Sequence, residues 1–194
     1  GTVECVTPIF DGMPDVDVMY DGYFSIVPYV IPGKYVAYAF SYTGGALMQW
    51  CTDTLAKKEK ELAKEAGCSV NEYLERAYAK EQEAAEEPTG ILVLPHFAGA
   101  ATPYMDTGSR GAILGLTTDT STADIYRACM EGVVYEMKLN VDALEGSGIR
   151  FTSMHATGGG AHSAVWMQMK ADMLNLPITA LKTVDAGTVG SAML

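Results

Sequence analysis

Glycines at three junctions between predicted elements are the residues whose type and spacing best suit a chemical task. The longest run comprises Gly158, Gly159, Gly160 and Ala161, between a predicted strand and a predicted helix. Glycine lets the backbone approach a ligand closely, and the free N–H groups and positive dipole end of a following helix favour a phosphate. Alone this signal is weak, because such glycines often form only a tight connection and the run matches neither G-x-G-x-x-G nor a Walker loop.

The other two junctions lie in the first quarter of the chain. Gly1-Thr2 runs into a predicted strand, where the Thr2 hydroxyl could contact a terminal phosphate. Thr43-Gly44-Gly45 precedes a predicted helix that carries Gln49 one turn in, and by itself this favours nothing more than a helix start. Three such junctions in one chain together indicate a nucleotide-binding cleft, although they do not name the reaction.

The remaining residues that could do chemistry point to no second kind of site. His96, His155 and His162 lie far apart without a carboxylate or cysteine at metal-ligand spacing, so we interpret them as loop or helix-start residues rather than zinc ligands. The sequence has no H-E-x-x-H, no G-x-S-x-G and no paired-cysteine motif. For Glu131, in the middle of a long predicted helix, an exposed or capping role is favoured over a buried acid. We therefore predict no metal-binding residue.

Length and charge limit the class of protein. The 194 residues carry 13 Lys and Arg against 24 Asp and Glu, a net charge of −11, and 48% of them are hydrophobic. These values suit one domain with a single core. With a pI of about 4.6 and no basic run, we expect neither nucleic acid nor a membrane surface as a partner. The apolar stretches fall short of the roughly 20 residues that span a bilayer, and scattered cysteines favour reduced thiols in a cytoplasmic protein.

The elements that must position the glycines are predicted from hydrophobic periodicity and turn residues. Residues 2–40 are rich in Val, Ile, Tyr and Phe between turn signals, and they predict short strands arranged as a meander. A helix begins near Gly45 and runs towards Ala66. Residues 57–87 hold most of the Lys and Glu around a thin apolar stripe, which predicts a solvated helical pair on the surface.

The second half of the chain alternates strands and helices. Residues 91–94 predict a buried strand, followed by a loop up to Gly111 and a short strand or turn. Ser and Thr residues before Asp124 predict an N-cap for a helix that keeps its apolar period to about Leu144. We then predict a strand over 151–156, a helix over 163–174, a strand over 178–181 and a helix from 187. This alternation predicts an α/β fold with at least partly parallel strand pairing.

The order of these segments resembles the carboxyl-terminal domain of the FGGY family of carbohydrate kinases, the group of xylulose, glycerol, gluconate, fucose and rhamnulose kinases. Residues 111–116 and, after seven residues, 124–131 are similar to the family's second signature, from which only Cys129 departs. In this chain, the residues similar to the family's loop before that signature are 94–99, 102–106 and 110–111. The family's nucleotide-binding turn, its following helix and its final helix are similar to residues 157–161, 166–172 and 187–192.

The resemblance implies an α/β, ribonuclease H-like domain of the actin/hexokinase-like ATPase type, with a mixed sheet flanked by helices. Residues 1–194 would form a single domain, the nucleotide-binding half of a two-domain kinase that closes on ATP, Mg²⁺ and a sugar or polyol. Thr2 would lie against the γ-phosphate, with Gly45 and Gln49 beside the nucleotide. The phosphates and adenosine of ATP or ADP would run along Gly158, Gly159, Gly160 and Ala161.

The sequence departs from the family pattern in three ways. The catalytic Asp, which serves as the base, is expected upstream of Gly1 together with the domain that makes most sugar contacts, so we expect this chain alone to be inactive. Val3 replaces the usual Ser after Gly-Thr, which removes one hydroxyl near the phosphates. Ala100-Ala101 stands where many pentulose kinases carry Glu-Arg, which weakens a xylulose assignment and leaves the sugar open.

Two other functions stay open. Val3 and Ala100-Ala101 are also compatible with a catalytically silent nucleotide-binding or regulatory relative of the same fold. The charged residues 57–87 could instead serve an interaction domain that binds no nucleotide. Because an excised half of a cleft enzyme exposes the face that met its other domain, we further expect self-association, for instance as a homodimer.

Overall fold

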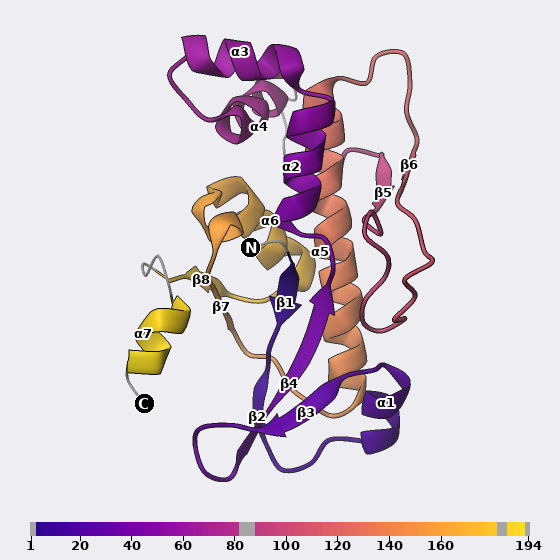
Figure 1. Cartoon of the computed structure of the whole chain (residues 1–194), viewed down its shortest axis with the longest axis vertical. Coiled ribbons are helices and arrows are strands. Elements are labelled where there is room, and N and C mark those ends of the chain that lie inside the picture. Colours follow the sequence, from indigo (N-terminus) through magenta and orange to yellow (C-terminus); the bar gives the residue numbers. More distant parts are fainter. Residues whose placement is uncertain (1–2, 82–87, 182–185, 193–194) are drawn as a thin grey trace.

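The computed structural model describes residues 3–81, 88–181 and 186–192, and its longest element is the helix α5 (Thr122–Gly146). The Ser121 hydroxyl accepts a hydrogen bond from the Asp124 amide, and the Asp124 carboxylate accepts one from the Ser121 amide. α5 runs along much of the long axis of the molecule, and other elements pack around it (Figure 1). The helix and the N-cap predicted for this segment are therefore confirmed.

Strand β4 (Lys34–Ser41) is the centre of the largest sheet. β1 (Glu4–Val6), β2 (Ile9–Asp11) and β3 (Ser25–Pro28) all pair with β4 in antiparallel orientation. β1 and β2 follow one another along β4, and between them the Ala37 amide donates to the Pro8 carbonyl at 3.1 Å. The predicted meander is therefore wrong. Pro8 has no N–H to add to a ladder, so it interrupts what would be one strand and leaves two short ones on the same partner.

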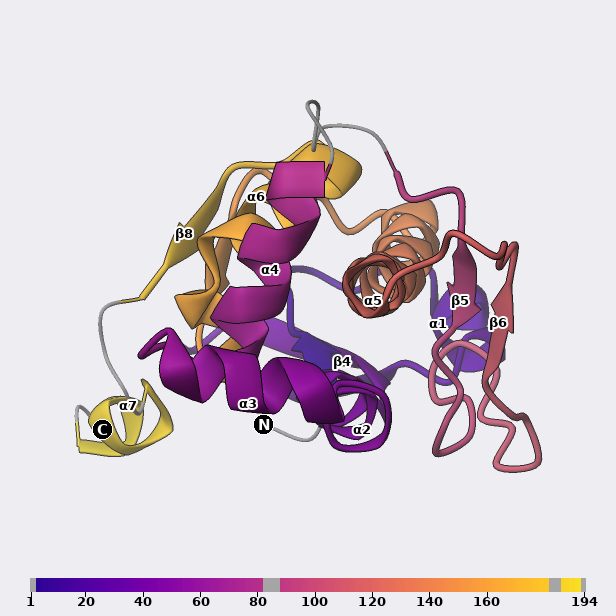
Figure 2. The same cartoon turned by 90° about the horizontal axis from the view of Figure 1, so that it is seen from above.

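Two smaller sheets follow in the second half of the chain. β5 (Leu92–Leu94) pairs with β6 (Ala112–Leu114) in antiparallel orientation, and β7 (Met154–Ala156) pairs with β8 (Ile178–Ala180) in parallel. The helix α6 (Ala164–Leu174) connects β7 to β8, and the predicted presence of parallel strand pairing is confirmed. In Figure 2, α5 lies between the β5–β6 ribbon on one side and α4 and α6 on the other.

The strand predicted over residues 91–94 forms, but it is not buried on both faces. Ile91 and Val93 are buried, whereas Leu92 is 55% and Leu94 is 41% exposed. The reason is that the ribbon packs on α5 by one face only. At Gly132 of α5 an added Cβ would lie 2.4 Å from the Val93 carbonyl oxygen, so glycine is what lets the strand approach the helix. Leu92 and Leu94 leave apolar surface on the other face of the ribbon, and self-association stays a prediction.

The helix predicted from Gly45 towards Ala66 is in fact two helices, α2 (Gly45–Thr54) and α3 (Lys57–Glu65). The chain turns at Ala56, which is fully buried, so α2 packs on α5 while α3 turns away to pack on α4 (Val70–Glu81). α3 and α4 form the charged pair at one end of the molecule (Figure 1). The predicted surface pair is confirmed for the described residues 57–81, whereas 82–87 lie outside the described residues.

Glu131 corrects another prediction, because only 1% of it is exposed although an exposed or capping role was favoured. Its carboxylate accepts a hydrogen bond from the Thr89 hydroxyl at 2.9 Å and forms an ion pair with Arg127 at 3.2 Å. The segment that leads into β5 therefore covers this part of α5. A buried carboxylate is tolerated here because its oxygens are paired and hydrogen-bonded.

Two short helices complete the described structure. α1 (Val16–Asp21) is capped by the Asp15 side chain and packs against α5. α7 (Ala186–Ala192) lies at the edge of the molecule, where a helix from residue 187 was predicted (Figure 1). None of the described helices combines the length and the apolar character that crossing a bilayer requires. All four cysteines are free thiols.

Candidate functional site

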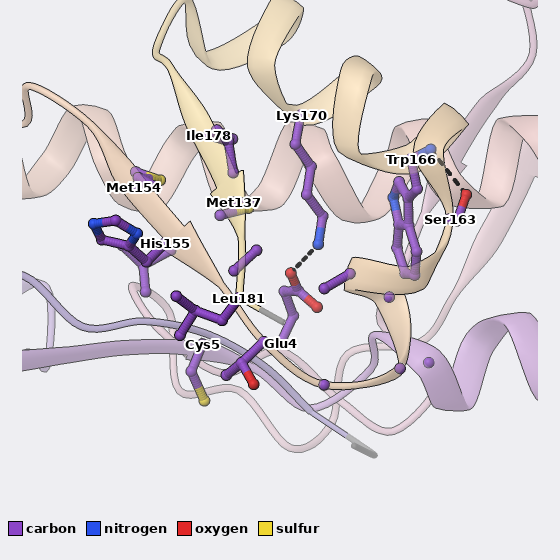
Figure 3. Close-up of a pocket in the computed structure, with 18 of the residues that line it drawn as sticks. Glu4, Cys5, Met137, Met154, His155, Ser163, Trp166, Lys170, Ile178 and Leu181 are labelled. Atoms are coloured by element: carbon purple, nitrogen blue, oxygen red, sulfur yellow. Dashed lines mark hydrogen bonds and ion pairs between the residues drawn. The ribbon is translucent and has the colours of Figure 1, made fainter. Parts of the chain in front are cut away.

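A cavity of about 1500 Å³ separates the β1 edge of the main sheet from the β7–β8 pair (Figure 3). Its walls come from β1, from the first turns of α2 and α4, and from the segment that runs from residue 150 through β7 to α6. These walls bring together segments that are far apart in the sequence. The two described glycine junctions both open on this cavity.

The glycine run forms a turn and a short 3-10 helix, η1 (Gly159–His162), before α6 begins. Gly158 has a φ of 89°, in the left-handed region that favours glycine. An added Cβ at Gly159 would meet nothing within 4 Å, whereas one at Gly160 would lie 3.0 Å from the Trp166 ring. The turn thus exposes backbone to the cavity at Gly159 and packs backbone on an indole at Gly160.

Ser163 fixes the start of α6. Its hydroxyl accepts a hydrogen bond from the Trp166 amide at 3.0 Å and donates one to the Glu75 carboxylate of α4 at 2.8 Å. Glu75 lines the cavity, and burial raises the pKa of its carboxyl, an effect that the Ser163 hydrogen bond opposes and the charge of Glu72 reinforces. The glycine turn is therefore tied to α4 through a polar contact that the sequence did not reveal.

The second glycine junction begins α2. An added Cβ at Gly44 would lie 3.1 Å from the Glu4 backbone nitrogen and 3.3 Å from a Glu4 carboxylate oxygen, so glycine is needed for β1 to pass this close. Gly45 starts the helix and Gln49 follows one turn on, and both line the cavity. The Gln49 amide donates to Asp53 at 2.8 Å, and this hydrogen bond, with one from Lys60, lowers the pKa of Asp53.

Buried contacts with α5 hold α2 in this position. Leu47 and Cys51 are fully buried, and the thiols of Cys51 and Cys129 share a hydrogen bond. That hydrogen bond and burial raise the pKa of Cys129, so this thiol stays protonated. Cys129 is the residue that departs from the family signature, and its role in the fold is to pack against α2.

The predicted nucleotide-binding residues can now be placed. Thr2 lies outside the described residues. The others line the same cavity: Gly45, Gln49, Gly158, Gly159, Gly160 and Ala161. Their spatial convergence is a property of the structure, whereas their roles toward ATP stay a prediction.

The sequence analysis did not single out Glu4 and Lys170, and it included Trp166 only through the resemblance to the family's nucleotide-binding helix. The Lys170 ammonium contacts the Glu4 carboxylate and lies 4.5 Å from the centre of the Trp166 ring (Figure 3). The spacing of Trp166 and Lys170 places them on one face of a helix, which was a signal that they act together. No local signal connected them with Glu4, which is 166 residues away from Lys170 in the chain.

The histidines do not assemble into a second site with metal-binding potential. His96 lies in the loop before β6, as predicted, where it contacts Ser109 at 2.7 Å and Glu136 at 2.9 Å. His155 is on β7 and His162 is in η1. Within the described ranges, no group of three or more His, Cys, Asp or Glu residues could hold a metal ion.

This fold is that of the actin/hexokinase-like ATPases, as its structural neighbours show. The chain superimposes on a Plasmodium falciparum glycerol kinase solved with ADP with a TM-score of 0.73 and 20% identity, covering 99% of this chain and 36% of that one. The pattern of the FGGY family of carbohydrate kinases, C-terminal domain, matches residues 8–194. The chain belongs to this family.

Curated relatives agree with this membership. A xylulose kinase of Staphylococcus epidermidis is 29% identical over 175 residues, which are 90% of this chain and 33% of the relative. A glycerol kinase of Lactococcus lactis is 32% identical over 174 residues, which are 87% of this chain and 32% of the relative. The chain therefore spans about a third of the length of the curated relatives it matches.

Proposed function

We propose that this chain is the ATP-binding domain of a longer carbohydrate kinase, which transfers the γ-phosphate of ATP to a hydroxyl of a ketose or polyol. The observation that carries the proposal is the convergence of Gly45, Gln49 and the glycine turn at residues 158–161 on one cavity. Membership of a kinase family supports the reaction class. Backbone N–H groups at glycine-rich turns can hold phosphates without a lysine, which suits a chain of net charge −11.

Mg²⁺ is part of this proposal as the partner of the nucleotide phosphates. In phosphoryl transfer Mg²⁺ neutralises developing charge, and it binds through one or two carboxylates, phosphates and retained water rather than a protein cage. The base that accepts the proton of the attacking hydroxyl is expected in the part of the kinase that precedes Gly1. A cytoplasmic location is also proposed, supported by the four free thiols.

The structure does not favour a pentulose as the acceptor over other sugars. Ala100 is 1% exposed and Ala101 is fully buried, in the loop where many pentulose kinases carry Glu-Arg. Long charged side chains at these positions would need space that the packed loop does not have. We therefore leave the acceptor at the level of a ketose or polyol.

The nucleotide part of the proposal is tested by calorimetric titration of the full-length protein with MgADP. Gly160→Asp places bulk and negative charge where the phosphates would run, and Gly159→Asp adds the same charge at a position where a Cβ meets no neighbour. We expect both variants to lose binding by about 100-fold or more, equivalent to about 2.7 kcal/mol. The matched control is Gly146→Asp at the exposed end of α5, where an added Cβ also meets nothing.

Two outcomes would count against the proposal. A wild-type protein that binds no MgADP contradicts a nucleotide-binding domain. If Gly159→Asp binds MgADP as tightly as the wild type, the nucleotide does not bind at the glycine turn. Incubation of the full-length protein with MgATP and a panel of ketoses, polyols and aldonates then tests the reaction. MgADP binding without turnover of any of them would favour the catalytically silent relative, which Val3 also motivates.

A further inference from the structure

Lys170 is a nearly buried cation at the edge of the cavity. Its side chain is 5% exposed and forms an ion pair with Glu4, whose side chain is 20% exposed. In Figure 3 Lys170 extends from α6 toward Glu4 of β1, beside the ring of Trp166. The ammonium therefore has two partners that fix its place, a carboxylate and the face of an indole.

This ion pair connects the two described glycine junctions. The Lys170 nitrogen lies 3.8 Å from the point where a Cβ on Gly160 would stand, so it lies directly beside the glycine turn. Glu4 packs against Gly44 at the start of α2. A ligand that lies between the two junctions is therefore close to both charges.

The charges that line the cavity make the position of Lys170 important for an anionic ligand. Glu72 and Glu75 also line the cavity, and an incoming nucleotide adds the negative charge of its phosphates. Arg150 lines the cavity as well, but its guanidinium donates to the carbonyls of Glu145 and Ile149. Among the described residues that line the cavity, Lys170 is the lysine beside the glycine turn, and without it Glu4 would present an uncompensated carboxylate to the phosphates.

Stability alone does not account for such a pair. A buried ion pair is often no more stabilising than well-packed apolar side chains of similar volume, because both charges lose their water. A fold that needed only a clamp between β1 and α6 could use apolar residues at both positions. An anionic ligand would gain from the Lys170 ammonium, because opposite charges attract strongly where little water is present.

We propose that Lys170 is a specificity-determining residue for the phosphates of the nucleotide, and that Glu4 and Trp166 hold its ammonium beside Gly160. This rests on the proposed function. Lys170 supplies the positive charge that the backbone N–H groups of the glycine turn supply only in part. Glu4 holds this charge in place and partly neutralises it, so that the nucleotide can still dissociate.

The test is a charge-graded titration of the full-length protein with adenosine, AMP, ADP and ATP in the presence of Mg²⁺. For Lys170→Met we expect the Kd of ADP to rise by about tenfold and that of adenosine to change by less than about twofold. For Glu4→Gln we expect ADP to bind as tightly as in the wild type or more tightly, because the ammonium loses its competitor. Lys170→Arg, which keeps the charge, should stay close to wild type for ADP.

The opposite signs of the two variants separate an electrostatic role from a structural one. If Glu4 and Lys170 were only a clamp, Lys170→Met and Glu4→Gln would weaken ADP and adenosine alike, and that result overturns the inference. If Lys170→Met fails to fold, Glu4→Gln tests the inference by itself. A tenfold loss of ADP affinity in Glu4→Gln would overturn the inference, because unchanged or tighter binding is expected. Wild-type protein that binds ADP with an affinity unaffected by Lys170→Met refutes the inference alone, whereas wild-type protein that binds no nucleotide refutes the proposed function.

Discussion

Charged side chains are buried in two regions of this molecule, and the regions differ in what surrounds those charges. Along α5, Glu131 is paired with Arg127 and Thr89, and Glu136 is paired with His96, within closely packed structure. Beside the cavity, Lys170 is paired with Glu4, but an open volume of about 1500 Å³ lies next to the pair. The first arrangement leaves no room for a ligand, whereas the second leaves room for one.

The comparison indicates that burial of a charge does not by itself identify a functional site. What distinguishes the cavity is that its charges adjoin glycine backbone that no side chain covers, at Gly159 in particular. Charges along α5 serve the fold, because they satisfy one another and join the helix to loops that cross it. We expect changes along α5 to alter stability without altering nucleotide affinity, and changes at the cavity to have smaller effects on stability.

The largest effect is expected from Arg127→Met. It leaves the Glu131 carboxylate, of which 1% of the side chain is exposed, without its cation, and we expect the free energy of unfolding to fall by about 3 kcal/mol. Arg76→Met is the matched control, because it removes the same side chain from an exposed pair with Glu72, where a loss of about 0.5 kcal/mol is expected. Denaturant titration of both variants measures the difference, and equal losses would contradict the distinction between the regions.

An intermediate effect is expected from adding one methyl group to a glycine in each region. At Gly132 of α5 an added Cβ lies 2.4 Å from the Val93 carbonyl oxygen, so Gly132→Ala should lower the free energy of unfolding by about 2 kcal/mol. At Gly159 an added Cβ meets nothing within 4 Å, so Gly159→Ala should change stability by less than about 0.5 kcal/mol. Thermal unfolding of the two variants compares them, and a less stable Gly159→Ala would show that this turn is packed.

Local signals in the sequence were sufficient for the elements that position the site. The Ser121 and Asp124 cap and the apolar period predicted α5, and the glycine run before Ser163 predicted the turn and the helix α6. These features depend on residues within a few positions of one another. A common cleft for the glycine junctions was indicated by their number in one α/β chain, and the family resemblance then assigned each of them a part in nucleotide binding.

The features that sequence analysis missed depend on residues distant in the chain. Glu131 is buried because the segment at Thr89 crosses α5. The sequence near Glu131 contains no signal that predicts this crossing. Glu4 meets Lys170 because β1 and α6 lie on opposite walls of the cavity. The break at Ala56 reflects the packing of α3 on α4, which overrides a helical pattern that continues through it. Tertiary contacts decided each of these features.

The smallest effect is expected from Glu75, the acidic side chain that joins the two regions by facing the cavity from α4. Burial raises its pKa in the folded state, so the folded protein binds this proton more readily than the unfolded chain does. Folding stability contributed by this group is therefore present at low pH and is lost as pH rises through the raised pKa. Glu75→Gln removes the titrating group, so its stability relative to wild type should increase from pH 4 to pH 7.

The measurement is the difference in unfolding midpoint between Glu75→Gln and wild type at several pH values. Glu61→Gln on α3 is the control, because it makes the same substitution at a side chain that is 70% exposed and does not line the cavity. The Ser163 hydrogen bond opposes the effect of burial, and the variant amide can still accept that bond, so the change should be small but should keep its sign. A variant that loses stability relative to wild type as pH rises would show that Glu75 is stabilised as a carboxylate, and that this wall of the cavity is more polar than its burial indicates.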